Sequence, residues 1–105
     1  MVQHVTSQQL EQLITASPVP VVCDFWASWC GPCRMLAPAF EAVAQKIGDR
    51  ARFVKVNVDE EEAAAIKYGI SSIPNVLIFK DGQVAANHLG FVPAEALQAF
   101  VENNL

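Results

Sequence analysis

Two cysteines, Cys30 and Cys33, stand three positions apart in the stretch WCGPC. Thiols at this spacing can close a disulfide bond, supply half of a four-ligand zinc site, or exchange electrons with another disulfide. The sequence holds no second such pair to complete a zinc site, and a domain with an ample core does not need a cross-link for stability. The pattern therefore favours redox chemistry, with a structural disulfide and a zinc site as the alternatives.

The redox interpretation requires elements that place the two sulfurs. Residues 21–27 are apolar at nearly every position, which is typical of a strand covered by helices on both faces. A helix is expected straight after it, because apolar residues then recur every three or four positions. These are Cys33, Leu36, Phe40, Val43 and Ile47. Cys30 therefore lies at the start of a helix, where unpaired N–H groups and the positive end of the dipole favour a thiolate. We expect Cys30 to be the nucleophile and Cys33, about one turn later, to be shielded.

The remaining elements alternate between strand and helix. The sequence predicts strands over residues 2–5, 52–58, 75–79 and 83–89, and helices that begin at Thr6 or Ser7, after Asp59 and at Pro93. Asp59 is expected to cap its helix, followed by three acidic residues in the first turn. Asp81 and Gly82 form a two-residue hairpin turn, which makes the last two strands antiparallel.

Composition limits the kind of protein. The chain has 105 residues, is 52% hydrophobic and carries a formal net charge of -4, which fits one compact domain over residues 1–105. It offers no basic patch for nucleic acid. No apolar run approaches the roughly 20 residues that cross a bilayer, and the N-terminus lacks the pattern of an export signal. We therefore expect a cytoplasmic protein that binds neither nucleic acid nor membrane.

Two lone charges stand in apolar strands. Asp24 lies in the strand before the cysteines, and Lys55 lies in the next strand. Buried charges persist when they are paired or functional, so the two residues form either a structural ion pair or part of the reaction site. The simplest interpretation of Cys23 is a small core residue. The two histidines, His4 and His88, lack the spacing of metal ligands and are expected at surface or edge-strand positions.

The chain resembles the thioredoxin family over nearly its whole length. The resemblance rests on the stretches DFWASWCGPCRMLAP, VKVNVDE, KYGISSIPN and FKDGQ and on the Gly90 loop, which follow the family's order. It implies the α/β thioredoxin fold, a central mixed five-stranded sheet flanked by four helices. Asn75 stands where the family usually has threonine, and Phe91 where a small residue is common. We expect these two departures to affect the choice of partner rather than the chemistry.

The resemblance also implies the reaction and its residues. Such a protein is a thiol–disulfide oxidoreductase that reduces disulfides in target proteins through Cys30 and Cys33, with Asp24 as proton acceptor and Lys55 tuning it. The implied target-binding residues are Trp29, Gly31, Pro32, Ile73, Pro74 and Gly90. The Ile73–Pro74 bond is expected to be cis, and the backbone of Ile73 to pair with an extended target.

The implied partners are a thioredoxin reductase and disulfide-containing target proteins. The reductase is either NADPH-dependent or ferredoxin-linked, and the small protein acts as a monomer without a cofactor of its own. Three rival functions remain: an interaction subunit whose dithiol is incidental, a zinc-binding module, and an oxidant or isomerase of secreted proteins. The missing export signal and the Gly-Pro pair between the cysteines favour a reductant.

Overall fold

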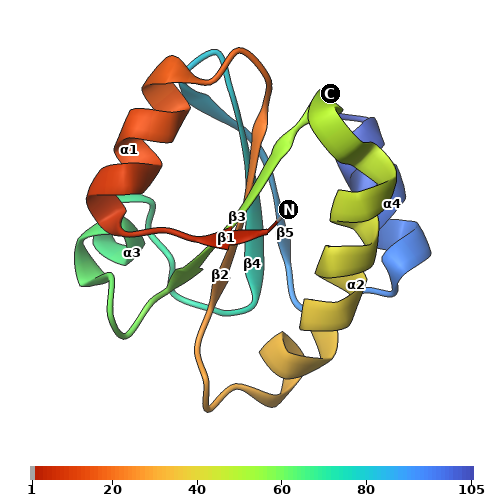
Figure 1. The fold of residues 1–105 in the computed structure, drawn as a ribbon. Helices are drawn as coiled ribbons and strands as arrows, with labels where there is room; N and C mark the ends of the chain where they lie inside the picture. Colours follow the sequence, from red (N-terminus) through yellow and green to blue (C-terminus); the bar gives the residue numbers. More distant parts are fainter. Residues whose placement is uncertain (1) are drawn as a thin grey trace.

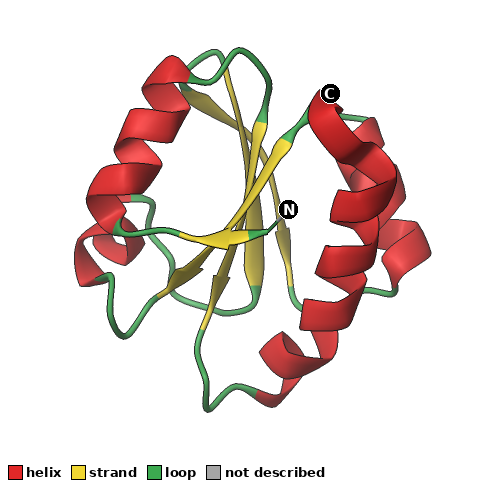
Figure 2. Ribbon diagram, in the orientation of Figure 1, coloured by secondary structure: helices red, strands yellow, loops and turns green. Residues whose placement is uncertain are grey.

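The computed structural model describes residues 2–105 and places one mixed sheet between two layers of helices (Figures 1 and 2). The elements are β1 (Gln3–His4), α1 (Ser7–Ala16), β2 (Val21–Trp26), α2 (Gly31–Ile47), a 3-10 turn (Gly48–Arg50), β3 (Arg52–Asn57), α3 (Glu62–Lys67), β4 (Asn75–Lys80), β5 (Gln83–Leu89) and α4 (Ala94–Glu102). The five strands are ordered β1-β3-β2-β4-β5. Between residues 2 and 105, no helix is long and apolar enough to cross a membrane.

The sheet is mixed because β2 runs parallel to β3 on one side and antiparallel to β4 on the other. The outer strand β1 is parallel to β3, and β5 is antiparallel to β4. Helices α1 and α3 cover one face, and α2 and α4 cover the other (Figure 1). The predicted mixed five-stranded sheet with four flanking helices is confirmed.

Strand β2 lies at the centre of the sheet, as its apolar sequence predicts. Its first five residues are buried, and they alternate between the two helical layers. Val22 packs in the core beneath α2 and α4, while Cys23 packs in the core beneath α1 and α3 and is fully buried. The expectation that Cys23 is a core residue is confirmed.

Helix α2 begins one residue after Cys30, which is its N-cap. All five residues predicted to face inward, from Cys33 to Ile47, are buried. Pro32 lies in the first turn, where its missing N–H leaves no helical hydrogen bond unmade. The helix thus starts at Gly31, the third residue of the WCGPC stretch, directly after its N-cap Cys30.

The expected cap at Asp59 is wrong, because α3 begins only at Glu62 and Glu61 is its N-cap. The side chain of Asn57 accepts a hydrogen bond from the backbone N–H of Asp59 at 2.9 Å. The backbone carbonyl of Asn57 accepts another from the backbone N–H of Glu61 at 2.8 Å. Asparagine favours such turns, and this one holds residues 58–61 outside the helix. One acidic residue, Glu62, remains in the first turn instead of three.

Glu61 instead supports the start of α1. Its carboxylate accepts hydrogen bonds from the backbone N–H of Ser7 at 2.7 Å and from the Ser7 hydroxyl at 3.1 Å. A carboxylate at this position complements the positive end of the α1 dipole. Thr6 caps the same helix in a capping box with Gln9, so the predicted start of α1 is confirmed.

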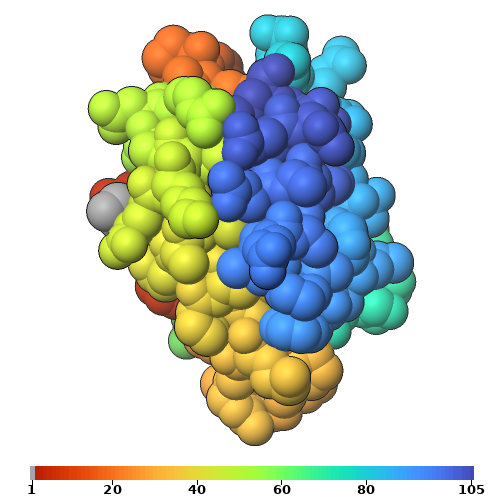
Figure 3. Space-filling view, turned by 90° about the vertical axis from the view of Figure 1, so that its right-hand side faces the viewer, coloured from red at the N-terminus to blue at the C-terminus, as the bar shows by residue number. Residues whose placement is uncertain are grey.

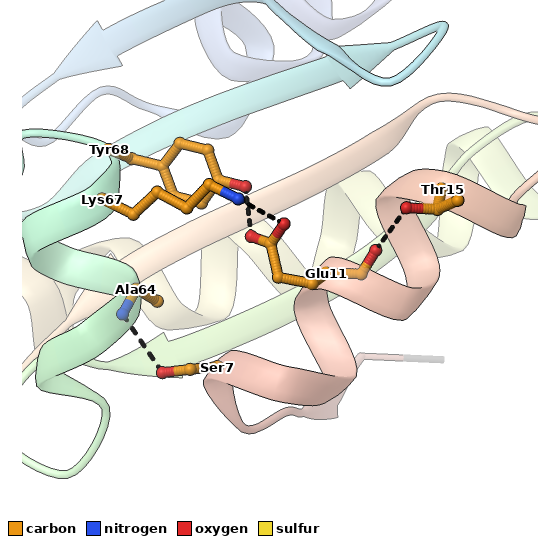
Figure 4. A network of polar contacts seen from close by, with 6 residues as sticks. All are labelled: Ser7, Glu11, Thr15, Ala64, Lys67 and Tyr68. Carbon is orange, nitrogen blue, oxygen red and sulfur yellow. Dashed lines mark hydrogen bonds and ion pairs between the residues drawn. The ribbon is translucent and has the colours of Figure 1, made fainter.

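A polar network joins the exposed sides of α1 and α3 (Figure 4). The carboxylate of Glu11 accepts hydrogen bonds from Lys67 Nζ at 2.6 Å and from the Tyr68 hydroxyl. One turn away, the hydroxyl of Ser7 accepts a hydrogen bond from the backbone N–H of Ala64 at 3.1 Å. These contacts fix the end of α3 against α1, and Tyr68 in turn packs edge-on against Phe79 of β4.

The hairpin between β4 and β5 has the predicted two-residue turn. Asp81 and Gly82 have φ angles of 54° and 81°, the left-handed values that a type I′ turn requires at both positions. A register shift between Ile78 and Phe79, which the sequence did not reveal, lies in the same strand pair.

Candidate active site

The two sulfurs lie where β2 leads into α2, at one end of the molecule. Figure 3, which looks onto α2 and α4, shows the segment before α2 at the lower end of the surface. Cys30 and Cys33 are joined by a disulfide bond, with their Cα atoms 5.2 Å apart. Cys30 Sγ also accepts a hydrogen bond from the backbone N–H of Cys33 at 3.2 Å. The structure is therefore the oxidised form, and the helix start already binds the Cys30 sulfur.

The surroundings of the two sulfurs differ. Cys30 retains 5% of its surface exposed, against 1% for Cys33, which lies inside the first turn of α2. An unpaired N–H group of a helix start favours the thiolate over the thiol, and in this site that group points at Cys30. Of the two, Cys30 is the sulfur that an incoming disulfide can reach.

Two loops from distant parts of the sequence complete the site. The Ile73–Pro74 peptide bond is cis, as predicted. The carbonyl oxygen of Ile73 lies 3.8 Å from Cys30 Sγ. The carbonyl of Pro74 accepts a hydrogen bond from the backbone N–H of Gly90 at 2.8 Å, and Gly90 has a φ of 86°, which favours glycine. Residues that are far apart in sequence thus meet around Cys30.

Trp29 stands out from the surface beside the disulfide. Its side chain is 67% exposed, yet its indole Nε1 donates a hydrogen bond to Asp59 Oδ2 at 2.8 Å. An exposed aromatic ring held in one orientation can offer apolar surface to a partner. Met35 is also exposed, at 58%, on the outer side of the first turns of α2.

Sequence reasoning missed the part that Asp59 plays here. The residue was expected to cap α3, whereas the structure uses its carboxylate to hold Trp29. Its place gave one usable signal: Asp59 follows β3 at the edge of the sheet where β2 also ends, beside Trp29. The sequence did not single out Met35, and nothing in its spacing distinguishes it from a residue on any exposed helix face.

Asp24 and Lys55 lie opposite each other on β2 and β3, and both are buried. Lys55 Nζ is 3.9 Å from Asp24 Oδ2, which is an ion-pair distance but too long for a good hydrogen bond. Neither carboxylate oxygen of Asp24 has a hydrogen-bond partner among the described residues. Burial therefore raises the pKa of Asp24 to about 6, and the opposing effect of Lys55 is smaller.

Trp26 links this ion pair to the dithiol, a role that sequence reasoning did not assign. Lys55 Nζ lies 4.8 Å from the centre of the Trp26 ring, a cation–π distance. Trp26 also packs against the small apolar cluster that contains Cys30 and Cys33. Asp24 and Trp26, being two residues apart in a strand, face the same side of the sheet, that of α2. The buried charge is thus in the layer behind the sulfurs.

The structure keeps Cys23 and the histidines apart from the dithiol. Cys23 faces the α1 and α3 side, and burial raises the pKa of its thiol well above the usual range. His4 lies on β1 in register with Lys55, and His88 lies on β5 in register with Val76, so both are on edge strands as expected. Residues 2–105 contain no group of three or more His, Cys, Asp or Glu side chains arranged to hold a metal ion.

Comparisons with known proteins agree with the fold. Residues 1–103 match the sequence profile of the family described as Thioredoxin. Thioredoxin of Bacillus subtilis is 51% identical over 85 residues, covering 81% of this chain and 82% of that protein. Thioredoxin 1 of Synechococcus elongatus is 46% identical over 101 residues, covering 96% and 94%. Thioredoxin of Haemophilus influenzae is 36% identical over 104 residues, covering 99% and 97%.

A disulfide-bonded pair at a helix start, in a sheet with this strand order, defines a thiol–disulfide oxidoreductase. Its redox pair is Cys30 and Cys33, and it acts as a protein-disulfide reductase. The chain belongs to the thioredoxin family. Membership implies, in general, disulfide-containing targets and a reductase that restores the dithiol.

Proposed function

We propose that the protein reduces target disulfides by two exchange steps that begin at Cys30. The Cys30 thiolate attacks one sulfur of the target disulfide, a mixed disulfide forms, and the other target sulfur leaves as a thiolate. Cys33 then attacks Cys30, the mixed disulfide breaks, and the second target thiolate leaves. Two electrons have passed to the target, and the Cys30–Cys33 disulfide remains. The observation that carries this order is the N–H of Cys33 donating to the more exposed sulfur of Cys30.

Asp24 takes the proton of Cys33 in the second step, directly or through one water. A carboxylate with a pKa of about 6 is matched to accepting a proton near neutral pH. Lys55 acts through Asp24, because its charge at 3.9 Å opposes the effect of burial. Support for both roles comes from the position of the pair behind the small cluster that holds the two sulfurs.

The target lies across the surface around Cys30. Trp29, Gly31 and Pro32 contact it on one side, and Ile73, Pro74 and Gly90 on the other. The carbonyl of Ile73 beside Cys30 Sγ supports pairing between this backbone and an extended segment of the target. The exposed ring of Trp29 supplies apolar contact.

The cellular setting follows from this chemistry. A thioredoxin reductase, NADPH-dependent or ferredoxin-linked, returns electrons to the Cys30–Cys33 disulfide. The chain works as a single domain over residues 1–105, as a monomer in the cytoplasm, and serves electron transport and redox homeostasis. The family's bacterial members support this setting.

The test is insulin reduction coupled to NADPH oxidation by a purified thioredoxin reductase. Wild type should turn over, whereas Cys30→Ser and Cys33→Ser should not. The two variants differ in what accumulates: Cys33→Ser should collect a mixed disulfide with insulin, and Cys30→Ser should not. Mass spectrometry that finds the target bound to Cys33 of Cys30→Ser at an equal rate would refute the proposed order.

A further inference from the structure

A groove lies next to the redox site, on the sheet face that α1 and α3 cover only in part. It has a volume of about 450 Å³. One wall is the end of α3 with Lys67 and Tyr68, the other is β5 with Val84, Asn87 and Leu89, and Asn75 and Leu77 of β4 contribute the floor. Val84 and Leu89 are 49% and 56% exposed, so the β5 wall offers apolar side chains to solvent.

The α3 wall of the groove is held by the network of Figure 4. The Tyr68 hydroxyl and Lys67 Nζ both donate to Glu11 of α1. Among the described residues, Lys67 is the one charged residue that lines the groove, and Glu11 neutralises it. The groove is therefore fixed on this side and presents no net charge.

An amide pair lies at the end of the groove nearest the sulfurs. Asn75 is 7% exposed, and its Oδ1 accepts a hydrogen bond of 3.5 Å from Asn87 Nδ2. A bond of that length is weak, so both amides retain capacity for another hydrogen bond. Asn75 is also one of the two residues expected from the sequence to affect the choice of partner.

The groove is continuous with the site around Cys30. Asn75 follows Pro74 directly, and Leu89 pairs with Asn75 across the sheet and precedes Gly90. Figure 1 shows β4 beginning and β5 ending at the end of the molecule where α2 begins. A target joined to Cys30 must continue on both sides of its cysteine, so one side of that polypeptide can pass directly into the groove.

We propose that the groove binds an extended, uncharged segment of the target polypeptide that flanks its reactive cysteine. Apolar side chains of the segment contact Val84 and Leu89, and its backbone or side-chain amides bond to Asn75 and Asn87. The inference rests on the proposed function and adds a second binding region to it. Val84 pairs with Phe79, four residues beyond Asn75, so the groove is about 13 Å long and holds about four extended residues.

The test uses peptide disulfides of two lengths with chemically reduced protein in excess. Each substrate is a symmetric pair of identical peptides joined through their single cysteine. Uncharged residues extend from one side of that cysteine, N-terminal or C-terminal, by about two or about six positions. One of the two long peptides should react about three- to tenfold faster than its short counterpart, because about one extra apolar side chain is buried.

A charge on the β5 wall of the groove should remove the faster reaction of the longer peptide. Val84→Glu should abolish the difference in rate between the long and short peptides, whereas Ile66→Glu should retain it. Ile66 is the matched control, being 72% exposed on α3 but not a lining residue of the groove. A long peptide that carries lysine near its far end should recover part of its rate with Val84→Glu.

Nuclear magnetic resonance gives a second measurement. A cysteine-free, uncharged hexapeptide should shift the side-chain amide signals of Asn75 and Asn87 and leave those of Asn103, at the end of α4, unchanged. If the wild type reduced all the peptide disulfides at equal rates, or if the hexapeptide shifted signals on another face of the protein, the proposed role of the groove would be overturned and the proposed function would remain intact. Signals that move when the protein alone is concentrated would assign the groove to a second copy and overturn the proposed occupant. If the reduced protein reduced none of the peptide disulfides, both the groove proposal and the proposed function would be overturned.

Discussion

At the scale of single residues, Cys30 and Cys33 differ in reach although they lie in one turn. Cys30 is the more exposed sulfur and has the N–H of Cys33 aimed at it, while Cys23 is fully buried. We expect a substoichiometric alkylating agent to label Cys30 first in the reduced protein, because the thiolate is the reactive form. Peptide mass spectrometry reads out the order. Earlier labelling of either other cysteine would contradict the proposed nucleophile.

Asp24 makes stability and activity move in opposite directions. Its pKa of about 6 in the folded protein is above the value in the unfolded chain, because burial disfavours the charged form. The favourable contribution of the protonated form is therefore complete below the unfolded pKa and is lost as pH rises through about 6. We expect Asp24→Asn to be more stable than wild type at pH 7.5, by about 1–3 kcal/mol, and nearly equal at pH 4.

The same variant should slow insulin reduction, because Cys33 loses its proton acceptor. The measurement is denaturant unfolding of the oxidised proteins at both pH values, beside their reduction rates. Asp49→Asn, at an exposed position, serves as control and should change neither. An Asp24→Asn protein that is less stable at pH 7.5 and equally fast would identify an ordinary structural ion pair.

At this scale, the chemical roles of the site residues could be predicted better than the contacts that hold these residues in place. Asp24 and Lys55 were recognisable because a lone charge in an apolar strand needs a partner, and neighbouring strands bring the two together. The bond between Trp29 and Asp59 depends on how two loops bend, and no periodicity encodes a loop path. For the same reason, the distance between the Ile73 carbonyl oxygen and Cys30 Sγ could not be predicted, although both residues were expected to belong to the site.

At the scale of elements, Glu11 joins α1 to α3. The hydrogen bond from Lys67 lowers the pKa of Glu11, with a further contribution from Tyr68. Because the folded pKa is the lower one, this stabilisation is present above the unfolded pKa and is lost as pH falls through the folded value. We expect Glu11→Gln to cost about 0.5–1 kcal/mol at pH 7, since the pair is partly exposed and screened.

The cost of Glu11→Gln should disappear at a pH below the lowered folded pKa of Glu11, where the carboxyl group is protonated in both the folded and the unfolded wild type. Thermal unfolding at pH 7 and at such an acidic pH measures it, and Glu41→Gln on the exposed face of α2 is the control. A cost that is the same at both pH values would show that packing, rather than charge, joins the two helices.

The turn between β4 and β5 depends on its backbone conformation. Gly82 has a φ of 81°, and a Cβ built there meets no atom within 4 Å, so a substitution changes conformational energy rather than packing. Gly82→Ala should cost about 1 kcal/mol of unfolding free energy, and Gly82→Asn clearly less, because asparagine tolerates positive φ. Equal costs for the two variants, measured by urea unfolding, would argue against this explanation.

Sequence periodicity predicted the elements whose apolar residues are regularly spaced, and it failed where a side chain redirects the backbone. The buried face of α2 and the span of β5 were correct, because the apolar spacing is regular in one and a turn signal precedes the other. The predicted start of α3 was wrong because the side chain of Asn57 accepts hydrogen bonds from the backbone N–H groups of Asp59 and Glu60 and delays the helix. The register shift at Ile78 leaves no mark in the composition of either strand.

At the scale of the whole molecule, the chain is compact and negatively charged. The radius of gyration of its Cα atoms is 12.2 Å, close to the roughly 13 Å expected for a globular chain of this length. We expect a monomer in sedimentation velocity over the micromolar range, since the net charge of -4 disfavours self-association. A dimer in this concentration range would contradict the prediction.

One rung of the sheet has a consequence for how the sequence can change. His4, Lys55, Asp24, Val76 and His88 stand in register across all five strands. Side chains alternate along β2, so inserting or deleting one residue ahead of Asp24 within the strand would turn the carboxylate to the α1 side and bring an apolar neighbour behind the dithiol. Changes of two residues would preserve the face. Length variation in this part of the chain therefore obeys an even-number rule inside β2, whereas the loop before Val21 can grow or shrink by any number.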